Sequence, residues 1–177
     1  MYSAFQLAKK YLQYYATAFN SKGHGVHSPF VFDFIKLIKN DRKKYDCYYS
    51  IEKLRQELLK DKTVIVVEDF GAGSSIIKTN KRRVDKIAAS SLKPKKFAQL
   101  LFRIVQFYKP VTVIELGTSF GISSAYLASG HSQVKLYTLE GASSIAGIAQ
   151  QNFNTLGLYN IDLIQGDFAV TFPKIFF

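Results

Sequence analysis

Residues 111–124 read Val-Thr-Val-Ile-Glu-Leu-Gly-Thr-Ser-Phe-Gly-Ile-Ser-Ser, and this stretch decides the fold. A β-branched, apolar run ends in the acidic residue Glu115, and a turn that contains Gly117 and Gly121 follows at once. The next residues, up to 130, are compatible with a helix. A strand, a turn and a helix in this order present backbone N–H groups and a carboxylate to a nucleotide-like ligand.

The alternation of strand and helix continues beyond this stretch. Hydrophobic runs and turn residues predict three strands with two helices between them: Val111–Leu116, Ser119–Ser129, Val134–Glu140, Ser143–Leu156 and Ile161–Gln165. Gly157 stands directly after the second helix, where glycine commonly ends helices. Strands that alternate with helices indicate βαβ units, and therefore a parallel sheet with right-handed crossovers.

The spacing of the glycine turn separates the kinds of nucleotide site it could form. A dinucleotide site needs the pattern G-x-G-x-x-G, but counting from Gly117 places Ser119 and Ile122 at the second and third glycine positions. A phosphate-binding loop needs a lysine after its last glycine, and Ile122 follows Gly121. The spacing therefore disfavours NAD, FAD and a phosphate-binding loop.

Residues 113–123 resemble the first motif of class I S-adenosylmethionine-dependent methyltransferases. They are closest to the bacterial O-methyltransferase-like branch, in which the form Gly-Thr-Ser-x-Gly is common. The resemblance implies that Glu115, at the strand end, interacts with the ammonium group of the cofactor, directly or through water. Gly117 and Gly121 allow the backbone to approach the cofactor closely, because glycine has no Cβ.

Two further acids stand at the predicted ends of the next two strands. Glu140 lies 25 residues beyond Glu115, and the resemblance implies that it accepts hydrogen bonds from the ribose hydroxyls. Asp167 ends the third strand, where the resemblance implies a bond to the adenine amino group, and Phe168 could pack near the ring. Three acids at the ends of three successive strands form a more specific pattern than one glycine turn.

The predicted fold class is α/β. An incomplete Rossmann-like parallel sheet in residues 95–177 follows a basic, mainly helical cap region in residues 1–94. The resemblance implies a cytoplasmic S-adenosylmethionine-dependent methyltransferase that transfers a methyl group to an oxygen of a small molecule. Eight residues are predicted to bind the cofactor: Glu115, Gly117, Thr118, Ser119, Gly121, Glu140, Gly141 and Asp167. No catalytic residue is assigned, and three histidines with one cysteine do not favour a metal site.

Charge is distributed unevenly along the chain. The net charge is +11, of which residues 1–109 carry +13 and residues 110–177 carry −2. A basic front part suggests an alternative function, a nucleic-acid- or polyanion-binding module with a vestigial Rossmann half. No aromatic and basic RNA-recognition motif supports this alternative. No apolar run approaches the roughly 20 residues of a transmembrane helix, so no membrane association is predicted.

The front part carries weaker structural signals. Helical spacing of apolar residues predicts an amphipathic helix in residues 1–19, and Ser28-Pro29 is typical of a capped helix start. The remaining predicted elements are three helices and one strand: Phe30–Ile38, Ile51–Leu59, Lys95–Tyr108 and Thr63–Glu68.

Several residues that could bind a ligand or take part in catalysis are interpreted as structural or surface residues. Asp69–Ser75 is a second glycine-bearing turn, but no apolar helix follows it, so we interpret it as a structural or substrate-side loop. His24 and His27 are interpreted as loop residues, and Cys47 as a packed side chain among tyrosines. The run Lys81–Arg83 could contact phosphate, although a solvated charged segment is the first interpretation.

The predicted sheet is short for the family that it resembles. A complete member resembles a seven-stranded sheet, whereas three such strands are predicted before residue 177. We therefore expect a truncated methyltransferase that retains a cofactor site without a complete catalytic apparatus. The region that supplies substrate contacts in the family, and sometimes metal contacts, is expected to be absent.

Overall fold

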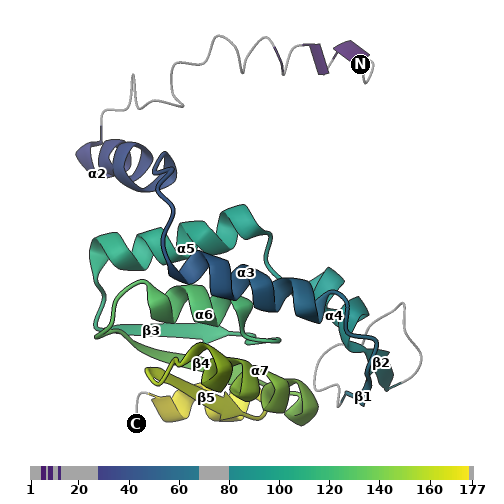
Figure 1. Cartoon of the computed structure of the whole chain (residues 1–177). Helices are drawn as coiled ribbons and strands as arrows, with labels where there is room; N and C mark the ends of the chain where they lie inside the picture. The colour runs from purple at the N-terminus through teal and green to yellow at the C-terminus, as the bar shows by residue number, and fades with distance from the viewer. Residues whose placement is uncertain (1–4, 7, 10–11, 13–27, 68–79, 176–177) are drawn as a thin grey trace. The chain divides into compact units, whose positions relative to one another are not determined.

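The computed structural model describes residues 5–6, 8–9, 12, 28–67 and 80–175 (Figure 1). The chain forms two compact units, Met1–Lys43 and Lys44–Phe177. Each unit is considered separately below.

The described residues of the first unit are mainly helical. Residues 5–6, 8–9 and 12 are helical, in agreement with the helix predicted there, and the rest of residues 1–19 lies outside the described residues. Helix α2, Pro29–Asp33, begins after Ser28, whose Oγ accepts a hydrogen bond from the Val31 N–H at 3.4 Å. It continues as a π-helix, η2, over Phe34–Lys39. The predicted helix start at Ser28-Pro29 is therefore confirmed.

The second unit contains the predicted parallel sheet. Strands β3 (Thr112–Leu116), β4 (Lys135–Glu140) and β5 (Ile161–Gln165) pair in the order β3-β4-β5. Both pairings are parallel, with Leu116 opposite Leu139 and Glu140 opposite Gln165. The carboxyl ends of all three strands therefore meet at one edge. The predicted strands and the α/β class are confirmed, with β3 and β4 starting one residue later than expected.

Two crossover helices connect these strands. Helix α6, Ile122–Ser129, follows β3, and helix α7, Ser143–Leu156, follows β4. Both contact the same helix, α3 (Cys47–Leu58), so they cover one face of the sheet, as right-handed crossovers require (Figure 1). Helix α6 is almost wholly buried, because α3 and α5 (Lys95–Tyr108) lie on its outer side.

Helix α6 begins three residues later than the sequence predicts. The residues from Ser119 to Gly121 instead form the turn, in which both of these residues have positive φ angles, +49° and +81°. Helix α7 has its predicted bounds, and Gly157 ends it with a φ of +67°. Helix α5 also has its predicted bounds, whereas α3 begins four residues earlier than expected, at Cys47.

A small two-stranded ribbon precedes α5 in the chain. Strand β1 (Val64–Val66) pairs antiparallel with β2 (Lys81–Arg83), and helix α4 (Val84–Ser91) follows directly. The strand predicted at Thr63–Glu68 is thus present in shorter form. Neither β2 nor α4 is among the elements predicted from the sequence, and Val84, Ile87 and Ala88 bury one face of α4 in the core.

The compact unit that holds the sheet begins at Lys44, well before the predicted region boundary at residue 94. Helices α3 and α4 share one hydrophobic core with α6 and α7, through residues such as Ile51, Ile87, Ala125 and Ile145. A division by role, into a cap and a cofactor-binding region, stays a prediction.

Two short helices follow β5 among the described residues, α8 (Phe168–Thr171) and η3 (Pro173–Ile175). Within the described ranges, no helix has both the length and the apolar character needed to cross a membrane.

Candidate functional site

The glycine turn after β3 is fixed by hydrogen bonds with one neighbouring strand, β4, and with one neighbouring helix, α7. The N–H groups of Gly117 and Thr118 both donate to the carbonyl of Leu139, at 3.0 Å each. On the other side of the turn, the amide of Asn152 on α7 donates to the carbonyl of Phe120 at 2.9 Å, and both groups are buried. The turn is therefore a rigid element, held before any ligand binds.

The two glycines of the turn serve different purposes. Gly117 has a φ of +92°, and a Cβ placed there would meet nothing within 4 Å, so its backbone faces open space. Gly121 has a φ of +81°, and a Cβ there would lie 2.4 Å from Cε1 of Phe153. Gly117 thus gives a ligand access to the backbone, whereas Gly121 allows α6 and α7 to pack closely.

Glu115 points from β3 towards the first turn of α6, where hydroxyl groups surround it. Its carboxylate accepts hydrogen bonds from Ser123 Oγ at 2.6 Å, from Thr138 Oγ1 at 2.7 Å and from Ser124 Oγ. Thr138 uses its one proton for Glu115, so in its 2.7 Å contact with Thr118 the latter hydroxyl must donate. Glu115 therefore connects β3, β4 and α6, and its predicted contact with a cofactor ammonium stays a prediction.

Glu140 ends β4 and connects the turn to the start of α7. Its Oε2 accepts the N–H of Ser119 at 2.8 Å, and its Oε1 accepts the N–H of Ala142 at 3.1 Å. Ser119 is a non-glycine residue with positive φ, a conformation that costs of order 1 kcal/mol and that this hydrogen bond helps to hold. Because a carboxylate has about four acceptor positions, both oxygens retain capacity for a ligand hydroxyl.

The remaining predicted residues lie around the same edge of the sheet. Asp167 follows β5 and caps α8, with its Oδ1 accepting the Ala169 N–H at 2.8 Å. Gly141 lies directly after Glu140, between β4 and α7. Phe168 is the first residue of α8 and is partly exposed. The predicted roles of Asp167 and Gly141 in cofactor binding are not tested by these contacts and stay predictions.

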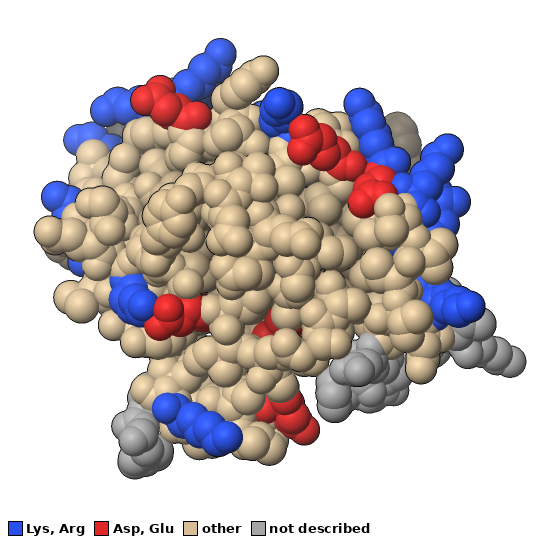
Figure 2. Space-filling view, turned by 60° about the horizontal axis from the view of Figure 1, so that its bottom comes forward, with Lys and Arg blue, Asp and Glu red and all other residues tan. Residues whose placement is uncertain are grey.

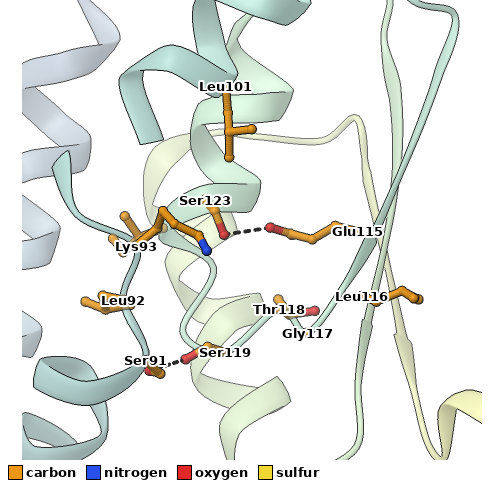
Figure 3. Close-up of a pocket in the computed structure, with 11 residues that line it drawn as sticks. Ser91, Leu92, Lys93, Leu101, Glu115, Leu116, Gly117, Thr118, Ser119 and Ser123 are labelled. Atoms are coloured by element: carbon orange, nitrogen blue, oxygen red, sulfur yellow. Dashed lines mark hydrogen bonds between the residues drawn. The ribbon is translucent and has the colours of Figure 1, made fainter. Parts of the chain in front are cut away.

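A cavity of about 260 Å³ opens in front of the glycine turn (Figure 3). Four of the eight predicted residues line it, together with side chains from α6, α5 and the segment that joins α4 to α5: Glu115, Gly117, Thr118, Ser119, Ser123, Ile122, Leu116, Leu101, Ser91, Leu92 and Lys93. In Figure 3 the amino group of Lys93 points into this space, towards Ser123. The cavity thus offers a carboxylate, hydroxyl groups, open backbone and one cation.

A second cavity, of about 650 Å³, adjoins the first. It is lined by β2, α4 and the ends of β4 and α7: Lys81, Arg82, Arg83, Lys86, Ile87, Ser90, Ser91, Ser119, Glu140 and Ile145. The two cavities share Ser91 and Ser119, whose hydroxyl groups are 2.8 Å apart. Of the predicted site residues, Ser119 lines both cavities and Glu140 lines the second, whereas Gly121, Gly141 and Asp167 line neither.

Several contributing residues were not found from the sequence. Ser123 and Thr138 orient Glu115, Asn152 holds the turn, and Ser91 and Lys93 close the cavity from the other side. The sequence did contain a signal for Thr138. When the acidic ends of the first two strands are aligned, Thr138 lies near Glu115, which is its partner in the pairing of β3 with β4. No local signal identifies Ser91 or Lys93, since tertiary packing alone brings them to the turn.

The other singled-out residues have mixed outcomes. Cys47 packs partly buried against the main core, and burial raises the pKa of its thiol, in agreement with a packed side chain. His24, His27 and the turn at Asp69–Ser75 lie outside the described residues. Among the residues that the structure does describe, no group of three or more His, Cys, Asp or Glu side chains could hold a metal ion.

Two solved structures share the fold of this chain. The first is the O-methyltransferase from Bacillus cereus in complex with SAH, with a TM-score of 0.51 and 18% identity over 82% of this chain and 52% of that one. The second is the SAH-bound methyltransferase from Podospora anserina, with a TM-score of 0.53 and 13% identity over 98% of this chain and 55% of that one. The chain thus spans about half the length of these structures. No protein-family model and no curated protein sequence matches it.

Proposed function

We propose that this chain binds S-adenosylmethionine at the glycine turn and belongs to the class I methyltransferases that it resembles. The observation that carries the proposal is Glu140, which stands at the end of β4, with one oxygen at the turn and the other at the start of α7, and retains acceptor capacity. The fold, shared with two SAH-bound methyltransferases, supports the same conclusion. The alternative of a nucleic-acid-binding module receives no comparable support.

The two cavities offer complementary partners to the parts of this cofactor. The aminocarboxylate fits the first cavity, where the open backbone at Gly117 allows close approach and Lys93 supplies a positive charge. The ribose hydroxyls fit Glu140, at the junction with the second cavity. The adenine would then extend towards Asp167, which follows the adjacent strand. This arrangement places the centre of the cofactor beside Ser119.

The chemistry that the cofactor supplies when bound is an electrophilic methyl group on sulfur. The residues of this chain bind and orient it, and methyl transfer depends mainly on such positioning of the two reactants. We propose that the acceptor is an oxygen of a small molecule and that the protein acts in the cytoplasm. Its single cysteine, partly buried, is compatible with a reducing compartment.

Replacing Glu140 by alanine is expected to weaken binding of SAH, S-adenosylhomocysteine, by about 10- to 100-fold, the loss expected for charge-assisted hydrogen bonds. The reason is that both ribose hydroxyls lose their acceptor. Isothermal titration calorimetry of the full chain with SAH measures the effect directly.

Asp162→Asn is the matched control for Glu140, because Asp162 is an acid on the neighbouring strand whose exposed carboxylate pairs with Lys135. It should bind SAH as the wild type does. The proposal is wrong if the folded wild-type chain does not bind SAH, or if the variant at Glu140 binds it with unchanged affinity.

Replacing Lys93 by glutamine tests the assignment of the first cavity to the aminocarboxylate. We expect SAH binding to weaken by about three- to tenfold, since Lys93 is exposed and its charge is partly screened by water. Binding of methylthioadenosine, which has no carboxylate, should not change. Lys95→Gln, at an exposed lysine two residues further on, serves as the control. An equal loss for both ligands would contradict the assignment.

A further inference from the structure

The larger cavity has a strongly cationic wall that the cofactor site does not explain. Lys81, Arg82, Arg83 and Lys86 line it from β2 and α4, whereas Glu140 is its only acidic lining residue among those described. Arg83 is paired with Asp85, through a contact of 3.1 Å between Nε and Oδ1. Even with Asp85 counted beside Glu140, four cations stand against two carboxylates, so the net charge of the wall is positive.

This wall fits an anionic ligand and does not fit the proposed cofactor. S-adenosylmethionine carries a sulfonium, an ammonium and one carboxylate, so its net charge is positive and the cationic wall would repel it. Lysine and arginine in one concave site are the usual partners of phosphate groups, with which they form charge-assisted hydrogen bonds.

The size of the cavity indicates a small molecule and not a polymer. Its volume of about 650 Å³ lies within the roughly 300–1,000 Å³ that is usual for small-molecule sites. A nucleic acid would need an extended basic surface to follow its backbone. On the face drawn in Figure 2, the described Lys and Arg side chains lie mainly at the margin, with carboxylates among them, and do not merge into one basic surface.

We propose that the cavity between β2 and α4 binds a small molecule that carries a phosphate or polyphosphate group. The group contacts Lys81, Arg82 and Lys86, and the rest of the ligand extends towards Ser119 and Glu140 at the glycine turn. We identify this ligand as the methyl acceptor, and that identification rests on the proposed function. The anion site itself does not depend on the cofactor.

The test is calorimetric titration of the full chain with inorganic pyrophosphate at physiological salt, alone and with saturating SAH. We expect saturable 1:1 binding that Lys86→Gln and Lys81→Gln each weaken by about tenfold, the loss expected for one charge-assisted hydrogen bond. Both lysines are exposed, so their replacement should not prevent folding. Lys174→Gln, which removes the same charge from η3 away from the cavity, should leave the affinity unchanged.

Four results would overturn the inference: no saturable binding of pyrophosphate, equal weakening by all three lysine variants, tighter binding of single-stranded RNA that competes with pyrophosphate, or mutual exclusion of pyrophosphate and SAH. Pyrophosphate and SAH should bind simultaneously, and mutual exclusion would show that the cationic wall belongs to the cofactor site. Pyrophosphate binding without SAH binding would reject the proposed function and keep the anion site. SAH binding without pyrophosphate binding would reject the anion site and keep the proposed function.

Discussion

Replacing Glu52 by alanine should lower the free energy of unfolding by about 2–5 kcal/mol, because two buried donors lose the partly buried carboxylate that accepts from them. Glu52 on α3 accepts hydrogen bonds from Arg55 Nε at 3.1 Å and from the hydroxyl of Tyr126, on α6, at 2.9 Å. Arg55 and Tyr126 are both buried, so the variant leaves a charge and a hydroxyl without their acceptor. Urea unfolding followed by far-UV circular dichroism measures the loss.

Tyr126 strengthens this expectation because its hydroxyl stays protonated and therefore needs an acceptor for its hydrogen bond. Burial, together with the hydrogen bond to Glu52, raises the pKa of its hydroxyl well above the ordinary value. In the variant the burial remains, so the hydroxyl stays protonated at neutral pH and still needs an acceptor. Glu57→Ala removes an exposed acid from the same helix and should change the stability by no more than about 0.5 kcal/mol. A similar small change for Glu52→Ala would refute the assignment of a buried network.

The same network reaches the candidate site. Nη1 of Arg55 donates to the carbonyl of Lys93 at 2.8 Å, and Lys93 lines the smaller cavity. Loss of Glu52 removes the carboxylate that orients Arg55, so the segment between α4 and α5 should loosen. We therefore expect Glu52→Ala to weaken SAH binding as well, at temperatures where the variant is still folded.

The sequence predicted the sheet well because its signals are local. The β-branched runs, the turn glycines and Gly157 each act through their own backbone, and the structure places β3, β4, β5 and α7 within one residue of the expected bounds. Strand β2 and helix α4 were missed because the run at Lys81–Arg83 is polar and pairs with a distant segment, Val64–Val66. Only Val84, Ile87 and Ala88, at helical spacing, carried a local signal for α4.

The candidate site could be predicted only in part, for a related reason. Glu115, Glu140 and the turn follow from position at strand ends, and the structure brings them to one edge of the sheet. What each acid contacts depends on strand register and helix packing. Glu115 meets Thr138 because the two residues are partners across β3 and β4. Its predicted ligand contact therefore competes with structural hydrogen bonds that no local pattern reveals.

Gly121→Ala is the second substitution for which we expect a large effect, a loss of about 2–5 kcal/mol in the free energy of unfolding. The new Cβ would lie 2.4 Å from Cε1 and 2.8 Å from Cζ of Phe153. Phe153 is a residue of α7 and is completely buried in the core, so its ring cannot move aside without displacing its neighbours. The positive φ of Gly121 adds a second, smaller cost.

Substitutions at two other glycines distinguish the cost of the clash with Phe153 from the cost of the positive φ angle. Gly117→Ala has a similar φ but no atom within 4 Å of its Cβ, so it should lose only the roughly 1–2 kcal/mol of the left-handed conformation. Gly147→Ala, at an open position inside α7, should stabilise the protein by about 0.5–1 kcal/mol. Phe153→Leu should offset part of the loss at Gly121 in a double-mutant cycle measured by urea unfolding. If Gly121→Ala costs no more than Gly117→Ala, or shows no coupling to Phe153, then close packing of α6 on α7 is not what requires glycine at this position.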